Sequence, residues 1–363
     1  MKTQTLTGEK NSLRGQNAVM PFNRRRLPLD GWEITLLVLF LAVVIGFSIT
    51  APGFYDSFPG LLSMTENFLP YGFVALGLSL VIFTGGIDLS VGTTASLAAV
   101  VAAQLWSAYG LNIWLAAGVG LGMGAALGAL NAAVIIRLKV EPLIATLATS
   151  FIYGSAAVAI AGDAPPSGFP DAFNAVGSEA LGVGGISGLI PYQLMLFMPL
   201  CVVFWLLVSR TAYGRKLVMV GYSSEAARYS GIRDWQILVT AYVISGLMAA
   251  LAGLVLAAYY SAVRPDMGDT LLLTTLTMVV LGGVSIFGGE GTMLGVIIAV
   301  LVLGFLRQGM LIAGYSDMVT TMVTGAILVL SIAIKNLFNT RGTGLGNRLW
   351  TMFRQRRQDG RVE

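Results

Sequence analysis

Residues 84–92 read Thr84-Gly85-Gly86-Ile87-Asp88-Leu89-Ser90-Val91-Gly92 and interrupt a long apolar run that extends from Leu69 to Trp106. A run of this length fits two membrane crossings, because a single crossing needs about 20 apolar residues. The Gly85-Gly86 pair is expected to end the first helix, since glycine costs about 1 kcal/mol in a helix interior. Asp88 and Ser90 are then placed to accept hydrogen bonds from the free N–H groups of the helix that follows.

Asp88 is the single acid in this apolar run. A carboxylate at membrane depth costs about 2.5–3.5 kcal/mol on insertion scales. One interpretation is a hinge or a polar lining in a transport path, formed together with Thr84 and the two glycines. The other is a helix cap at a membrane surface, where the acid meets the positive end of the helix dipole. The residues alone leave both interpretations open.

The composition is that of a polytopic helical membrane protein. The 363 residues are 56% hydrophobic and 11% charged, with a mean hydropathy of +0.79, which is outside the range of soluble domains of this size. The 45 glycines suit close contacts between helices in lipid.

The residue inventory excludes several kinds of active site. The chain has no histidine and a single cysteine, Cys201, which lies in an apolar run. A disulfide, a zinc site of the usual Cys/His type, a histidine triad and a Cys–His dyad are therefore excluded. No cluster of carboxylates suggests a general acid–base pair. We predict no catalytic residue, no metal and no cofactor, and we expect Cys201 to serve in packing.

The apolar runs predict an all-α protein with about ten transmembrane helices. The first crossing is expected at 34–50 and is expected to stay uncleaved, because no convincing small-residue cleavage site follows it. The other spans are expected at 62–84, 91–109, 113–137, 143–161, 191–209, 237–260, 270–287, 291–313 and 318–337. Each is long enough for a hydrocarbon core of roughly 30 Å.

Basic residues set the orientation. With the N-terminus inside, four segments are cytoplasmic and hold 20 of the 22 Lys and Arg residues, leaving Arg264 and Arg307. These segments are residues 1–32, 137–139, 210–236 and the tail from Lys335. This bias predicts that both termini face the cytoplasm, and it accounts for the net charge of +4 without nucleic acid. Arg307 lies inside a predicted span, so it must meet a carbonyl, an acid or a wet cavity.

A second glycine-rich break resembles the first one. Residues 282–291 read Gly-Gly-Val-Ser-Ile-Phe-Gly-Gly-Glu-Gly and end another crossing on the same predicted side. The two breaks are typical of transporters built from duplicated halves, or they are ordinary glycine-rich membrane turns. On the opposite side, the connection 162–190 is rich in Gly, Pro, Ser and acids and is too short for a domain.

The cytoplasmic loop 210–236 contains a short helix of small and charged residues. Ser223 or Ser224 can cap a helix over residues 225–229, and Gly231 is placed to stop it. Such a helix can dock into a groove of another protein, or it can lie on anionic lipid. Composition favours the lipid interpretation.

Five segments together resemble the permease subunits of ATP-binding-cassette importers for simple sugars, the ribose/xylose/autoinducer-2 group. They are Gly85 to Gly92, Glu141 to Leu147, Thr211 to Arg215, Glu225 to Ile232 and Leu281 to Gly289, in the order of the family. The resemblance covers about residues 30–337. Three further segments, at 30–33, 261–268 and 306–310, are most similar to permeases of autoinducer-2 import, although rhamnose permeases share several of these features.

The resemblance implies a fold, a division of the chain and a set of partners. It implies a type II-like permease domain at 33–337, with the coupling loop 210–236, between cytoplasmic tails at 1–32 and 338–363. It implies a multi-pass protein of the bacterial inner membrane. Its partners would be an ABC ATPase, a periplasmic or extracellular solute-binding protein, and a second permease copy or a related permease.

The resemblance also implies roles for single residues. The helix that couples to the ATPase would include Ser224, Glu225, Ala226, Ala227, Arg228 and Gly231. Many relatives have Gly-Gly-Asn before this helix, whereas this chain has Gly221-Tyr222-Ser223-Ser224, which puts the fine docking geometry in doubt. Candidate residues of the translocation pathway or its hinge are Thr84, Gly85, Gly86, Asp88, Ser90, Asn67 and Asn131.

Two other functions were weighed. An ion-coupled secondary transporter would use Asp88 and Glu290 as coupling sites, although few ionisable residues lie at membrane depth and the docking-type loop would have no purpose. A membrane enzyme is disfavoured by the lack of an acid–base pair. The chain holds no Gly-x-x-x-x-Gly-Lys-Ser/Thr loop, so ATP would bind another subunit. No residue pattern fixes the solute.

Overall fold

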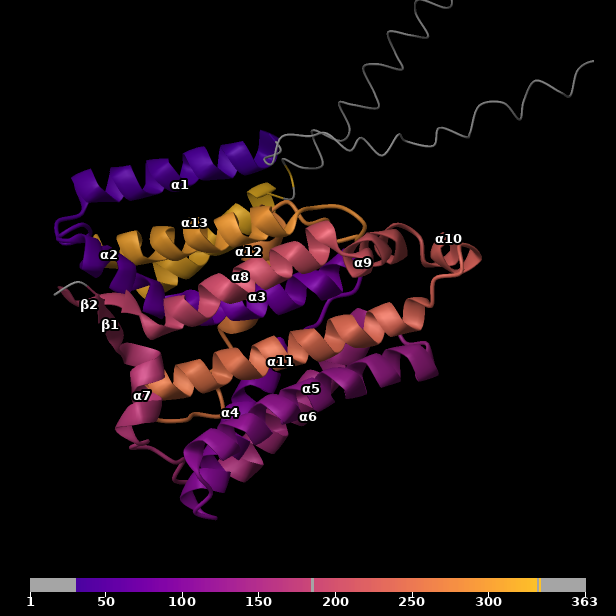
Figure 1. The fold of residues 1–363 in the computed structure, drawn as a ribbon, viewed down its shortest axis with the longest axis horizontal. Coiled ribbons are helices and arrows are strands. Elements are labelled where there is room, and N and C mark those ends of the chain that lie inside the picture. Colours follow the sequence, from indigo (N-terminus) through magenta and orange to yellow (C-terminus); the bar gives the residue numbers. More distant parts are fainter. Residues whose placement is uncertain (1–30, 184–185, 332, 334–363) are drawn as a thin grey trace, which may run out of the picture.

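The structure is a computed structural model that describes residues 31–183, 186–331 and 333 (Figure 1). Nearly all of the predicted tail 1–32 and the whole of the tail 338–363 lie outside the described residues. The helices are α1 (Gly31–Thr50), α2 (Phe58–Ser63), the 3-10 helix η1 (Met64–Asn67), α3 (Leu69–Phe83), α4 (Val91–Ser107), α5 (Ile113–Leu138), α6 (Pro142–Ala161), α7 (Asp171–Ser178), α8 (Tyr192–Arg210), α9 (Ala212–Tyr222), α10 (Ser224–Tyr229), α11 (Asp234–Tyr260), α12 (Leu271–Leu281) and α13 (Met293–Ile312). A further apolar helix follows at Asp317–Ser331.

The helices confirm a polytopic helical protein, with fewer full-length spans than ten. Six helices are long and apolar enough to cross a membrane, and the pair Phe58–Asn67 and Leu69–Phe83 makes a seventh if its 57° bend is one broken span. Val91–Ser107, Leu271–Leu281 and Asp317–Ser331 are shorter apolar helices. The predicted span at 270–287 was too long, because the Gly282-Gly283 break ends α12 at Leu281, and the predicted span at 91–109 exceeds α4 by two residues. The end of the predicted span at 318–337 lies outside the described residues. The bend before Leu69 lies where Pro70 opens α3.

The helix α3 forms the centre of the bundle. All of its residues from Leu69 to Phe83 are buried, and it packs against α11, α12, α13, α8 and α9. A helix that is apolar on every side can be stable only when other elements surround it. The helix α3 is therefore enclosed by its neighbours over its whole length, and Figure 1 shows it crossing the middle of the bundle.

The helices α5 and α11 approach each other through glycine. A Cβ on Gly128 would overlap the carbonyl oxygen of Tyr242, and Gly124 and Gly246 face each other's carbonyls in the same way. Small residues spaced four apart let helix backbones come close in lipid, where dispersion and polar contacts drive packing. The abundance of glycine in the composition thus serves helix contact here, as predicted.

The two glycine breaks share one backbone design. Gly85 and Gly283 each follow a helix C-cap and have φ angles of +82° and +90°. At each break one amide bonds to the carbonyl three residues back and the next amide to the carbonyl five residues back. The donor–acceptor pairs are Gly85–Ile82 and Gly86–Val81 in the first break, and Gly283–Val280 and Val284–Val279 in the second. The same pair of hydrogen bonds also ends α10, α11 and α13, so it is a common form of helix end and leaves both interpretations of the two breaks open.

The connection 162–190 carries regular structure that its composition did not reveal. It contains α7 and an antiparallel hairpin of β1 (Ala180–Val183) and β2 (Ile186–Pro191). Buried Phe173 of α7 packs edge-on against Trp114, and Gln193 of α8 donates to the carbonyl of Gly177 at 2.5 Å. The hairpin and α7 lie at the opposite end of the bundle from α10 (Figure 1). We call these the outer end and the inner end, following the predicted orientation.

Candidate functional site

The segment α9–α10 forms a well-capped turn of two helices at the inner end. Thr211 accepts from the Gly214 amide at 3.3 Å at the start of α9, and Ser223 accepts from the Ala226 amide at 3.1 Å at the start of α10. Gly231 ends the second helix with a φ of +77°. Ser223, rather than Ser224, is therefore the cap, and Gly231 is the predicted stop.

The helix α10 has exposed side chains on one face and buried ones on the other. Glu225, Ala226 and Arg228 are exposed, and the Arg228 guanidinium pairs with Asp234 at the start of α11 over 2.9 Å. Ala227 is buried, so its side chain faces the bundle and anchors the helix instead of reaching a partner. Half-buried Ser224 donates to the Val220 carbonyl at 3.2 Å and is likewise turned inward.

A buried polar cluster surrounds Asp88. The carboxylate accepts from the Ser90 hydroxyl at 2.7 Å, from the Ser90 amide at 3.0 Å and from the Ser245 hydroxyl at 3.2 Å. Asn131 donates to the Ser90 hydroxyl at 2.8 Å, and the Tyr153 hydroxyl donates to Asn131 at 3.0 Å. All five residues are at most 2% exposed. The first break is thus joined by side chains to α5, α6 and α11.

The burial of Asp88 argues against one of its two interpretations. The carboxylate is 1% exposed and lies among packed helices, which is not the environment of a cap at a membrane surface. Ser90 occupies the N-cap position of α4 but makes no side-chain cap bond, so the prediction that it caps α4 was wrong. Its hydroxyl is instead committed to Asp88. All side chains of the cluster are buried in this conformation.

The other residues predicted for the pathway lie apart from this cluster. The Thr84 hydroxyl donates to the Val81 carbonyl of its own helix, which closes α3. Gly85 is exposed at the inner end, whereas Gly86 is buried. Asn67 lies exposed before α3, where it accepts from the Tyr259 hydroxyl at 2.9 Å and lines a pocket of 360 Å³ with Asp56 and Glu66.

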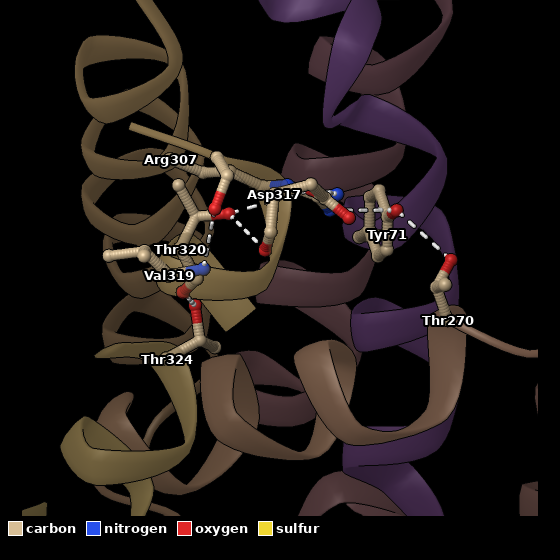
Figure 2. Close-up of polar contacts among 8 residues, drawn as sticks. Tyr71, Thr270, Arg307, Asp317, Val319, Thr320 and Thr324 are labelled. Carbon is tan, nitrogen blue, oxygen red and sulfur yellow. Dashed lines mark hydrogen bonds and ion pairs between the residues drawn. The ribbon is translucent and has the colours of Figure 1, made fainter. Parts of the chain in front are cut away.

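A second polar cluster lies around Arg307 in α13 and is drawn in Figure 2. The Arg307 guanidinium donates to the Tyr71 hydroxyl at 2.9 Å and to the Asp317 carboxylate at 2.7 Å. It also stands 5.4 Å from the centre of the Tyr71 ring. The Tyr71 hydroxyl lies 3.2 Å from the Thr270 hydroxyl. The prediction that Arg307 must find a carbonyl, an acid or a wet cavity is confirmed by the acid.

Sequence reasoning missed several members of both clusters. Ser245 and Tyr153 are polar residues in apolar helices, which is a usable signal, but their partners lie 157 and 22 residues away. Tyr71 and Asp317 showed no pattern that connects them to Arg307. Within the described residues no group of three or more Cys, Asp and Glu side chains is placed to hold a metal ion.

The comparisons with known proteins identify the class. The model of the branched-chain amino acid transport system permease component matches residues 60–332. The chain belongs to this permease family. It is 36% identical over 308 residues to the autoinducer 2 import system permease protein LsrD of Salmonella typhi, which covers 83% of this chain and 90% of the relative.

A relative from a second genus agrees. The protein of the same name from Yersinia pseudotuberculosis serotype O:1b is 34% identical over 313 residues, which covers 85% of this chain and 92% of the relative. This chain is therefore a multi-pass permease subunit of the inner membrane, and the importer interpretation is supported over an ion-coupled transporter. As a permease, it is the transport component of its system.

Proposed function

We propose that this permease forms half of the translocation pathway of an importer driven by a separate ATPase subunit, with α10 as the element that the ATPase grips. The observation that carries the proposal is a short, rigidly capped helix at the inner end that exposes Glu225, Ala226 and Arg228. A partner can bind such a helix in a groove, since Ala226 lets the groove wall approach closely.

The anchoring of α10 suits a mechanical role. Buried Ala227 packs the helix against the bundle, and the Arg228–Asp234 ion pair connects it to the first turn of α11. The helix α11 in turn packs along α3, α4 and α5. A displacement of α10 would therefore be passed to the centre of the bundle. ATP would bind on the partner, and a solute-binding protein would deliver the solute to the outer end.

We propose autoinducer 2 as the solute, because that is the solute in the printed names of relatives up to 36% identical over most of the chain. Rhamnose and ribose are the competing solutes. The second permease is either another copy of this chain or a related chain. The measurement is ATP-driven uptake by the complete complex in liposomes, with each of the three solutes offered alone and then in competition.

Two substitutions test the role of α10. Gly231→Pro should lower solute-stimulated ATP hydrolysis about tenfold, because proline cannot adopt the positive φ that ends this helix. Glu225→Ala should lower it about threefold, since an exposed charge contact is worth at most about 1 kcal/mol. Both variants should insert normally. Gly122→Ala, at a position in α5 with open space around it, is the matched control.

The same assay separates the proposal from ion-coupled transport. Liposomes that hold only this chain are given an imposed proton or sodium gradient. The proposal expects no solute uptake there and uptake only when the ATPase and ATP are supplied. Uptake by the isolated chain would reject the proposal in favour of a secondary transporter, and full stimulation in both α10 variants would remove α10 from the mechanism.

A further inference from the structure

Three backbone segments meet at the inner end without any side chain between them. They are the first break at Gly85, the end of α9 at Gly221, and the second break at Gly288-Gly289. A Cβ on Gly221 would overlap the carbonyl oxygen of Phe83 and would lie 2.6 Å from the amide nitrogen of Gly289. We call these four glycines the glycine junction.

In the glycine junction each of the three segments contacts the other two. A Cβ on Gly288 would lie 2.6 Å from the Gly85 nitrogen and 3.0 Å from the Gly221 oxygen. A Cβ on Gly289 would lie 2.8 Å from the nitrogen of Tyr222. Real Cβ atoms do not come this close to backbone, so these positions exclude any larger residue. Gly288 and Gly289 also have φ angles of +84° and +75°, which glycine alone adopts readily.

One hydrogen bond joins the two breaks directly. The amide of Gly289 donates to the carbonyl of Phe83 over 3.0 Å. Phe83 ends α3, and its carbonyl has no partner within the helix, because the last four carbonyls of any helix lack one. The second break thus completes the end of the helix that precedes the first break. This bond is independent of the small size of the glycines.

Gly221 connects the glycine junction to α10. It is the second-to-last residue of α9, and Ser223 then caps α10. The coupling helix is therefore two residues away from a point where the chain is packed, backbone on backbone, against both breaks. Packed backbone cannot yield as a long side chain can, so a shift of α9 and α10 must displace both segments or separate from them.

We propose that the glycine junction moves as one rigid body and carries the movement of α10 to both helix breaks at once. This inference rests on the proposed role of α10. It assigns positioning roles to Gly221, Gly288 and Gly289, which do not touch the solute. One coupling segment would then move both breaks together.

The first test loosens the junction. Gly221→Ala is expected to leave ATPase binding intact, because α10 keeps its caps, while solute uptake per ATP hydrolysed falls about tenfold, within the range of measured coupling between sites. Gly122→Ala, where a Cβ meets nothing within 4 Å, should behave as the wild-type complex. An unchanged ratio of uptake to ATP hydrolysis in Gly221→Ala would overturn the proposal.

The second test uses the wild-type complex, so it decides the question even if Gly221→Ala does not insert. Hydrogen–deuterium exchange follows the amide of Gly289, which is bonded to the Phe83 carbonyl over 3.0 Å, with and without ATP and solute. A rigid junction predicts equal protection of this amide in both conditions. Loss of its protection during ATP hydrolysis would show that the segments separate and would overturn the proposal.

The controls separate this inference from the proposed function. The wild-type complex must show ATP-driven uptake before any variant is read. Absence of that uptake rejects the proposed function itself, whereas wild-type uptake together with separation of the junction rejects only the relay.

Discussion

Asp88 and Arg307 are both charged residues among apolar helices, yet the bundle holds them in opposite ways. Asp88 is fully buried and accepts from two hydroxyl groups and one backbone amide, which come from its own segment and from α11. Arg307 lies nearer the outer end and pairs with a carboxylate whose side chain is 62% exposed. One charge is held by neutral hydrogen-bond donors in a closed core, and the other by an opposite charge at a partly open edge.

The two clusters should therefore differ in the free energy needed to open them. The Asp88 cluster can open only if several buried bonds break together, and each group left without a partner in the core is costly. The Arg307–Asp317 pair is more open, because Asp317 is 62% exposed and is solvated when the pair separates, while Arg307, 22% exposed, keeps its bond to Tyr71. The Asp88 cluster therefore fixes the first break, whereas separation of the Arg307–Asp317 pair would loosen the start of the helix Asp317–Ser331 from α13.

The largest effect is expected for Asp88→Ala. It leaves the buried hydroxyls of Ser90 and Ser245 without their acceptor and should lower the free energy of unfolding by about 3 kcal/mol. The matched variant Asp88→Asn keeps an acceptor oxygen and should cost only about 1 kcal/mol. Thermal unfolding of the detergent-solubilised permease measures both. Equal losses in the two variants would mean that the carboxylate oxygens do not hold the cluster.

Ser245→Ala should have the next largest effect. It removes one of the donors to Asp88 and nothing else of the cluster, so a loss of about 1.5 kcal/mol is expected, as for a hydrogen bond to a charged group. The Ser245→Thr variant, which keeps the hydroxyl, serves as the control. A double-mutant cycle with Asp88→Ala, which removes the acceptor, measures the coupling between the two residues, and additive losses would contradict their direct contact.

Arg307→Met should cost about 1 kcal/mol, less than Asp88→Ala or Ser245→Ala, since the exposed carboxylate of Asp317 can take up water when its partner is removed. The methionine keeps the apolar stem of the side chain. The measurement is again thermal unfolding, paired with uptake by the assembled complex. A loss of unfolding free energy as large as that of Asp88→Ala would contradict this difference between the two clusters.

Asp317→Asn should have the smallest effect, about 0.5 kcal/mol, and the effect should shrink at high salt because exposed ion pairs are screened. The stability difference from wild type is measured at low and at high ionic strength. The Asp88→Asn difference, by contrast, should not change with salt. A salt-independent loss in Asp317→Asn would place the Arg307 pair in a closed environment.

The two clusters also show what the sequence alone can predict. Asp88 and Arg307 stand out because a charge in an apolar run is rare, and both were identified from that fact. Asn131 was named as a polar residue in a span, but its bond to Ser90 joins residues 41 apart in the chain. No local pattern reports contacts of this range, so the partners Ser245, Tyr153, Tyr71 and Asp317 emerged only from the fold.

The same limit applies to the elements. Capping residues and glycines predicted the start and stop of α10 and the end of α3, because these signals act within a few residues. The hairpin β1–β2 was not predicted, since its register depends on pairing across a turn rather than on composition. The role of Ser90 was misjudged because a serine before a helix usually caps it, and here a buried acid competes for the same hydroxyl.

The first turn of α1 reaches across to the second break. The Trp32 indole donates to the Leu281 carbonyl at 2.9 Å, and Thr292 donates to Glu33 at 2.6 Å. A helix at the rim of the bundle therefore braces a turn that belongs to the far end of the chain. A shortened protein that begins after Glu33 would still insert its first crossing, but it would lack this brace, so fusion partners and affinity tags belong upstream of Trp32.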